Sequence, residues 1–293
     1  MKTILVPTDF SSNATNALNF AAGLASQVRG KLIIVHIINL PITPLNGVII
    51  PPDAQLVEDC KQELNRLSKE LCLENGFRFE VETICLYGYF LANLNEIAKA
   101  KAVDLVVMGT KGATNFLDKL IGTNTSGFIQ IATCPVLAIP AEAKFSGLKQ
   151  IAYASDFECE ESVFLQQLFS FAEPFRANVS IINILTERQL NIFADNQVIR
   201  DITRQFPDNN YSIAQIQEQS VVKGLQEFIL DNQVDVLAVS IQERTFLESL
   251  FHKSISKQLI YNPRIPLLAL PQKASAKAVR PVIKPKQSLV AVK

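Results

Sequence analysis

The residues of this 293-residue chain that are best placed to do chemistry lie between Gly109 and Thr125. Two glycines three positions apart are followed, after nine intervening residues, by four consecutive small or polar residues. The six residues are Gly109, Gly112, Gly122, Thr123, Asn124 and Thr125. Glycine lets the backbone approach an anion closely and adopt positive φ, and successive backbone N–H groups form an anion nest. Threonine hydroxyls at the positive end of a helix dipole suit phosphate, so the segment predicts a phosphate-binding loop.

The alternative is a glycine-rich surface turn followed by a threonine helix cap. Lys111 is a candidate to add a positive charge to a phosphate-binding loop. Neither GxxxxGK[ST] nor GxGxxG occurs in the sequence, so the nucleotide-binding folds with those signatures are not supported.

The elements that must position this loop are alternating strands and helices. Continuous apolar runs such as Leu32–Ile38 and Leu105–Met108 are typical of strands buried on both faces. In the first half we expect strands near 2–9, 31–39, 78–87, 104–109 and 135–140, and helices near 12–29, 55–74, 90–102 and 123–133. In the second half we expect strands near 150–155, 178–185, 211–217, 235–240 and 265–270, and helices near 159–176, 192–205, 221–232 and 246–261. This alternation predicts an α/β fold of two tandem doubly wound domains, each with a five-stranded, mostly parallel sheet flanked by helices.

The two halves are related as an internal repeat. Ile4–Phe10 corresponds to Ile151–Phe157 at an offset of 147, and both segments are apolar strands that end in Asp-Phe. Asp104–Gly109 corresponds to Asp235–Ser240 at an offset of 131. The first half therefore carries 16 extra residues in its middle, and we expect some of them in the proline-rich loop 41–52. Ordered matches of this kind indicate duplication.

The domains are expected at 1–142 and 149–271, followed by a basic tail at 272–293. The tail contains six Lys or Arg and no acid. It is interpreted as a solvated segment, with an added edge strand at 288–292 as the next alternative and a lipid or nucleic-acid contact as the last.

Three ordered motifs resemble the universal stress protein family. They are the spacing Gly-x2-Gly-x9-Gly-Thr, the opening Val6–Ser11 and the closing Cys134–Leu137. The resemblance covers both halves, so the chain is similar to a tandem universal stress protein.

The resemblance implies an ATP-binding regulator of the stress response, with Mg²⁺ as an option. The Pro-Thr-Asp turn would hold the adenosine, the end of the second strand would flank the base, and the glycine loop with the helix start would hold the phosphates. The implied residues are Pro7, Thr8, Asp9, Ile37, Met108, Gly109, Gly112, Gly122, Thr123, Asn124 and Thr125. For Asp9 the alternative role is a cap for the helix that starts near Ser12. In the family the fifth strand mediates dimerisation, which implies an internal pseudo-dimer of the two halves and leaves a further homodimer open.

The second half departs from this pattern. Counted without gaps, Ser240, Glu243, Lys253 and Ser254 replace Gly109, Gly112, Gly122 and Thr123. A carboxylate at position 243 conflicts with phosphate, or pairs with Lys253 across an empty pocket. We therefore expect ATP in domain 1 only, and Asp156 to be a helix cap.

Other classes of function are disfavoured. Residues 1–271 hold 22 basic and 28 acidic residues, a net charge of −6, which argues against nucleic-acid binding. No apolar run of 18 residues and no signal peptide is present, and five cysteines lack CxxC spacing, so we expect a cytoplasmic protein with free thiols and no membrane span.

No nucleophile and base occur at a workable spacing, so we expect no enzyme. His36 is interpreted as a satisfied core histidine, and the pair Glu160–Glu161 as solvated charge. The two other hypotheses are an interaction scaffold with structural or no nucleotide and an unknown protein partner, and a slow ATPase or nucleotidyl transferase.

Overall fold

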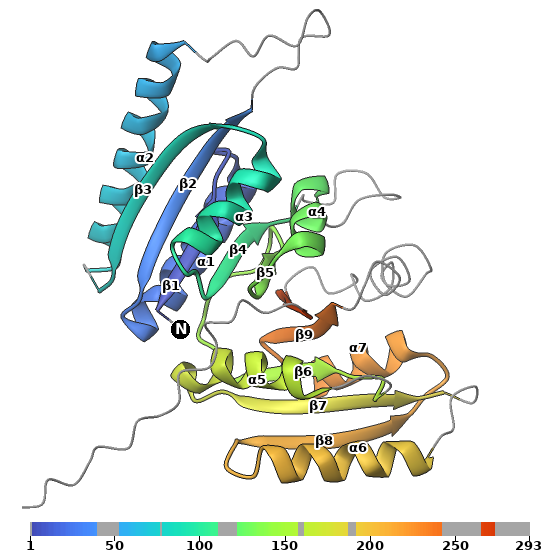
Figure 1. Cartoon of the computed structure of the whole chain (residues 1–293). Coiled ribbons are helices and arrows are strands. Elements are labelled where there is room, and N and C mark those ends of the chain that lie inside the picture. Colours follow the sequence, from blue (N-terminus) through green and yellow to red (C-terminus); the bar gives the residue numbers. More distant parts are fainter. Residues whose placement is uncertain are drawn as a thin grey trace, which may run out of the picture.

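The computed structural model describes residues 2–39, 53–76, 78–110, 122–157, 161–186, 192–241 and 265–272, and of residues 192–195 it describes the backbone only. Within these ranges the predicted alternation of strands and helices is confirmed (Figure 1). The first half contains β1 (Thr3–Pro7), α1 (Ser12–Val28), β2 (Lys31–Asn39), α2 (Ala54–Glu74), β3 (Glu80–Gly88), α3 (Phe90–Ala100), β4 (Leu105–Gly109), α4 (Thr123–Ile131) and β5 (Val136–Ile139). The second contains β6 (Gln150–Ala154), α5 (Glu161–Ala172) with the 3-10 turn η1 (Glu173–Phe175), β7 (Asn178–Leu185), α6 (Ile192–Gln205), β8 (Tyr211–Gln217), α7 (Val221–Asp231), β9 (Val236–Ile241) and β10 (Leu267–Pro271).

The ten described strands form one sheet in the order β3-β2-β1-β4-β5-β10-β9-β6-β7-β8. All neighbours are parallel except β5 and β10, which pair antiparallel with Leu137 opposite Leu268. Each half therefore has the same strand order, and the fifth strands join the halves. The twist of the sheet turns the strands of the second half well away from those of the first (Figure 1).

Helices cover both faces of the sheet because the strands bury alternate side chains on opposite sides. Ile4 and Val6 of β1 pack in a cluster that includes residues of α1, α2, α5 and α6. Leu5 packs in the other cluster, with residues of α3, α4 and α7. The continuous apolar strands of the sequence thus correspond to a sheet buried on both faces.

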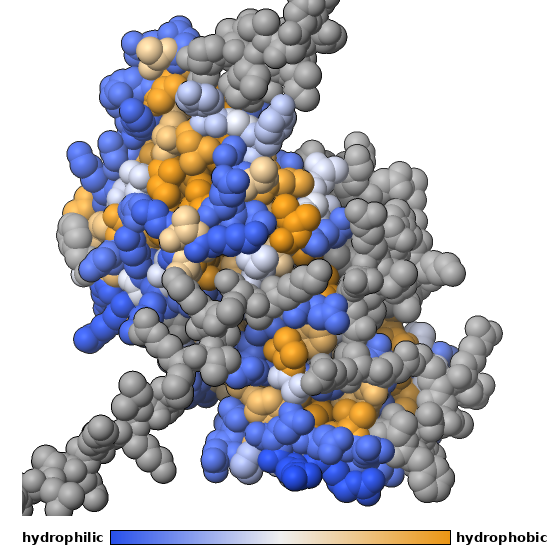
Figure 2. Space-filling view, in the orientation of Figure 1, coloured by the Kyte–Doolittle hydropathy of each residue, from blue (hydrophilic) through white to orange (hydrophobic). Residues whose placement is uncertain are grey.

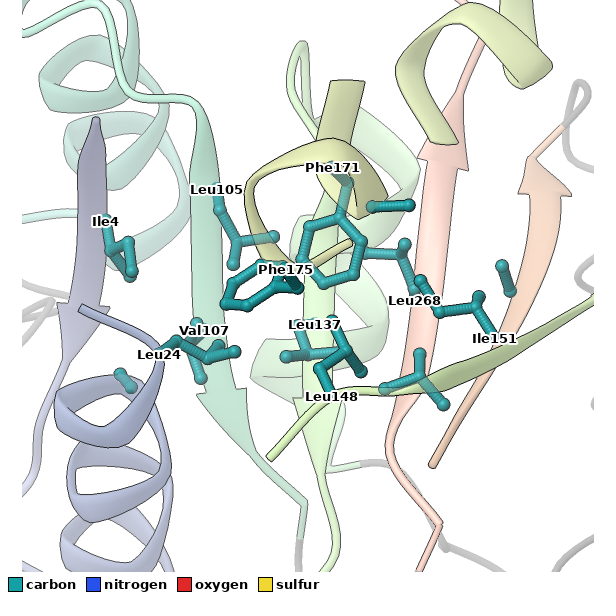
Figure 3. Close-up of a cluster of buried hydrophobic side chains, with 14 of the residues drawn as sticks. Ile4, Leu24, Leu105, Val107, Leu137, Leu148, Ile151, Phe171, Phe175 and Leu268 are labelled. Atoms are coloured by element: carbon teal, nitrogen blue, oxygen red, sulfur yellow. The ribbon is translucent and has the colours of Figure 1, made fainter. Parts of the chain in front are cut away.

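The core runs without interruption across the junction of the halves. Leu137 from the first half and Leu148, which lies between the two domains, belong to one cluster with Phe175 and Leu268 from the second half (Figure 3). By contrast, the outer faces of α2 and α6 are hydrophilic in Figure 2, as expected for helices that cover a sheet. None of the helices in the described ranges is long and apolar enough to cross a membrane.

The repeat is visible in hydrogen bonds as well as in strand order. Asp104 Oδ2 accepts hydrogen bonds from the backbone N–H groups of Lys2 and Thr3, at 2.6 and 2.9 Å. Asp235 Oδ2 accepts the equivalent bonds from residues 149 and 150, at 2.7 and 2.9 Å. The extra residues of the first half lie partly in α2, which has 21 residues against 14 in α6. Seven of the 16 thus lengthen a helix, and the rest precede it.

Candidate functional site

The predicted site residues gather at the carboxyl ends of β1 and β4. These two strands are neighbours in the sheet, but the chain leaves β1 toward β2 on one side and leaves β4 toward β5 on the other. Such a switch in direction opens a crevice where α/β sheets of this kind bind ligands. Residues 7–9 lie at the end of β1 and residues 108–110 at the end of β4, on the two sides of this switch point.

The turn after β1 is held in a specific shape by short-range hydrogen bonds. The Phe10 N–H donates to Thr8 Oγ1 at 3.0 Å, and the Ser11 N–H donates to Asp9 Oδ1 at 3.0 Å. Phe10 has φ of 63°, a left-handed conformation that costs energy for a bulky residue. The bonds around it offset that cost and fix where Asp9 projects.

Asp9 is exposed, and the helix cap is a different residue. Ser11 is the N-cap of α1, and its Oγ accepts a hydrogen bond from the Ala14 N–H at 3.2 Å. The alternative role of Asp9 as the cap is therefore wrong. Within the described residues Asp9 Oδ2 makes no hydrogen bond, so this oxygen is available to a ligand.

The end of β2 extends beyond its partner. The register of β1 with β2 ends at Pro7 opposite Val35, whereas β2 continues to Asn39. Ile37 lies in this extension, 6% exposed and packed in the cluster that contains Met108. Ile37 and Met108 thus belong to one apolar cluster close to the ends of β2 and β4.

Gly109, the last residue of β4, is required by packing. A Cβ at this position would lie 2.6 Å from the backbone oxygen of Asn13, so only glycine lets β4 approach the first turn of α1 this closely. Gly109 does not have a positive φ, and Gly122 has φ of −55°. The expectation that these glycines serve a left-handed backbone is therefore wrong for both.

The start of α4 presents backbone donors. Gly122 is the N-cap of α4 and provides no side-chain cap, while Thr123 and Asn124 are exposed. The first N–H groups of a helix lack partners within the helix, and they attract anions when no side chain caps them. Thr125 differs, because it is 3% exposed and its Oγ1 donates to the Gly109 carbonyl at 2.9 Å. Its hydroxyl proton ties α4 to the end of β4.

Two of the predicted loop residues, Lys111 and Gly112, lie outside the described residues. So do the loop 40–52, most of the basic tail, and positions 243, 253 and 254 of the second half. Among the described residues, no three His, Cys, Asp or Glu side chains form a group that could hold a metal ion.

The second half builds the same turn with different partners. Phe157 has φ of 57°, and its N–H donates to Ser155 Oγ at 3.0 Å. The Ser155 hydroxyl donates a hydrogen bond to Glu161 Oε1. The Thr8 hydroxyl, by contrast, donates to no acceptor within the described residues. The hydroxyl of the second turn is therefore fully engaged inside the protein. The expected cap by Asp156 involves residues 158–160, which lie outside the described residues.

Glu161 corrects the sequence interpretation. We expected solvated charge, but Glu161 is 5% exposed and accepts a hydrogen bond from the Tyr153 hydroxyl at 2.6 Å as well as the bond from Ser155. A signal was present, because Tyr153 stands at the repeat position of Val6 and Glu161 at that of Ala14. A buried tyrosine hydroxyl needs a partner, and the repeat alignment brings a carboxylate to the same helix start.

Comparison with known proteins gives consistent matches. The model of the universal stress protein family matches residues 1–140. Over 139 residues the chain is 30% identical to universal stress protein A homolog 1 of Coxiella burnetii, covering 47% of this chain and 95% of that protein. It is 28% identical over 155 residues to a universal stress protein of Methanocaldococcus jannaschii, covering 47% and 94%. A crystal structure of a universal stress protein from Archaeoglobus fulgidus covers 92% of this chain and 98% of its own, with a TM-score of 0.70 at 15% identity, and this likeness extends the shared fold over both halves.

Proposed function

Because this chain belongs to the universal stress protein family, we propose that its first half binds ATP, with Mg²⁺ as the counterion, in the crevice between β1 and β4. Binding would bias the shape or the assembly of the protein and thereby alter its affinity for a protein partner in the stress response. Such regulation requires that the two states of the protein differ in their affinity for the nucleotide.

The observation that carries this proposal is the difference between the two turns. In the first half, Thr8 and Asp9 retain a hydroxyl proton and a carboxylate oxygen without partners among the described residues. These groups complement the hydroxyls of a ribose, which both donate and accept. In the second half, the hydroxyl of Ser155 already donates its hydrogen bond to the buried carboxylate of Glu161. This contrast supports a single nucleotide site, in domain 1.

The phosphates would lie at the start of α4. Gly122 leaves the first backbone N–H groups of the helix uncapped, and Thr123 and Asn124 are exposed beside them. These are the donors that a phosphate chain prefers. Gly109 and Thr125 would contribute indirectly, by fixing the distance between β4, α1 and α4. Mg²⁺ would neutralise phosphate charge when bound.

We propose binding without turnover. Phosphoryl transfer to water needs a group that orients or activates the water, and the carboxylate that the described residues offer here, Asp9, follows β1 on the adenosine side of the proposed site and not at the start of α4. The fifth strands already pair with each other within the chain, so we propose the internal pseudo-dimer as the regulatory unit. A further homodimer would use another surface.

Calorimetric titration of the full chain with ATP and Mg²⁺ tests the proposal. Asp9→Asn preserves Oδ1, which accepts from Ser11, but removes the charge; we expect about tenfold weaker binding, the loss typical of a charged hydrogen bond. Asp156→Asn is the matched control in the second half and should leave affinity unchanged. The absence of heat and of a thermal shift at millimolar ATP would contradict nucleotide binding and favour a scaffold. Production of ADP by the wild type above that of Asp9→Asn would contradict binding without turnover.

A further inference from the structure

The side chain of His36 occupies a place that neither the motif nor the proposed contacts explain. β1 leaves the sheet after Pro7, so the carbonyl of Thr8 has lost the backbone partner that a longer strand would supply. His36 Nδ1 lies 2.8 Å from this carbonyl oxygen. A carbonyl can only accept, so Nδ1 carries the proton and donates.

His36 also contacts the strained residue of the turn. Its ring centroid lies 4.6 Å from that of Phe10, with the planes inclined by 32°. Phe10 has φ of 63°. One side chain of β2 thus holds the turn at two points, which flank Asp9 in sequence. A hydrogen bond and a ring contact of this kind restrict the rotation of the peptide that carries the carboxylate.

The second half repeats the arrangement with another residue type. At the offset of 147, Asn183 Nδ2 donates to the Ser155 carbonyl at 3.0 Å, and Phe157 has φ of 57°. Asn183 is 4% exposed. Two unlike side chains at the same strand position therefore make the same bond to the same carbonyl. The shared requirement is a single N–H donor, and the imidazole as such is not needed for it.

We propose that His36 is a positioning residue of the nucleotide site, which acts through the Thr8 carbonyl to hold Asp9 in its binding orientation. This inference rests on the proposed function for its effect on ATP, but the effect on the turn is independent of any ligand. The structure assigns no chemistry to the imidazole, so asparagine should replace it.

The test compares His36→Leu, which removes the donor, with His36→Asn, which restores the solution found in the second half. Asn183→Leu is the matched control, because it removes the equivalent bond from the other turn, together with a 3.4 Å contact to Gln215. Circular dichroism and thermal unfolding of the full chains establish that each variant folds.

The first readout is hydrogen exchange of the Phe10 and Ser11 amides, measured by NMR without nucleotide. We expect exchange to be about tenfold faster in His36→Leu, the change expected from the loss of one part-buried hydrogen bond, and unchanged in His36→Asn and Asn183→Leu. Equal protection in the wild type and His36→Leu would overturn the inference. So would failure of His36→Asn to restore protection.

The second readout is ATP affinity. We expect Kd to rise about tenfold in His36→Leu and to remain within about threefold of the wild type in His36→Asn and Asn183→Leu. If the wild type binds ATP and His36→Leu binds equally well, the positioning role is wrong. If the wild type binds no ATP, the proposed function fails, and the exchange measurement still decides whether His36 holds the turn.

Discussion

Gly122 is the position where helix stability and nucleotide binding can be separated by single substitutions. It is the N-cap of α4, with φ of −55° and ψ of 151°, and as a glycine it offers no side-chain cap. These angles are open to any residue. Aspartate and asparagine are both favoured N-caps and have nearly the same shape, so Gly122→Asp and Gly122→Asn differ by one negative charge at the helix start.

The expected magnitudes follow from this geometry. Either substitution adds a capping bond to a backbone N–H of the first turn, which should change the free energy of unfolding by only a few tenths of a kcal/mol relative to glycine. The added charge of aspartate acts on a bound phosphate. Two unit charges about 4 Å apart repel by about 4 kcal/mol at an effective dielectric constant of about 20, and by about half as much at twice the distance. We therefore expect Gly122→Asp to bind ATP at least about thirtyfold more weakly than Gly122→Asn.

Thermal unfolding without ligand and calorimetric titration with ATP and Mg²⁺ measure the two effects. Because Gly122 is buried, Gly122→Asn reports any steric cost of a side chain at this position. The charge effect is the difference between the two variants. Equal affinity of Gly122→Asp and Gly122→Asn would refute the assignment of the α4 start to phosphate.

Three further predictions concern the scaffold. Gly109→Ala places a Cβ 2.6 Å from the Asn13 carbonyl oxygen and should lower the free energy of unfolding by about 1–3 kcal/mol; an unchanged urea midpoint would contradict this packing. Burial raises the pKa of the Cys134 thiol to about 12, so at pH 8 iodoacetamide should leave Cys134 unmodified in the folded chain, and peptide mass spectrometry that finds it alkylated would contradict its burial. Hydrogen bonds from the Lys101 and Lys31 side chains hold the pKa of the Glu82 carboxyl below its usual value. These side chains are partly exposed, so Glu82→Gln should lower stability at pH 7 by at most about 1 kcal/mol. The difference should shrink as the pH falls below about 4.5 and the carboxyl of the wild type protonates; a difference that persists at pH 2 would contradict the ion pair.

The central strands could be predicted closely because their apolar runs are buried on both faces, whereas the edge strands β3 and β8 are only partly buried. β2 and β7 begin and end where the sequence places them, and β1 is shorter than expected, by one residue at the start and two at the end. The end of β1 could not be derived from the apolar pattern alone. Residues Thr8 and Asp9 leave the strand because their side chains accept hydrogen bonds from the next two N–H groups, which closes the turn.

Within the site, sequence could identify the residues but could not assign their partners. Thr123 and Thr125 look equivalent as helix-start threonines, yet only Thr125 is buried, because its hydroxyl meets a carbonyl 16 positions away. Glu161 appeared as surface charge because its partners Tyr153 and Ser155 lie on a strand and in a turn that precede its helix. Such pairs depend on how closely a helix approaches the sheet, and no local pattern reports that distance.

We propose that the chain has two copies of the fold but only one nucleotide site. Equilibrium dialysis of the full chain against ATP with Mg²⁺, carried to saturation, counts the sites directly. The proposed asymmetry between the Thr8 and Ser155 turns predicts one ATP bound per chain. Two ATP molecules per chain would contradict the proposal that the second half binds no nucleotide. No bound ATP would contradict the proposed site itself.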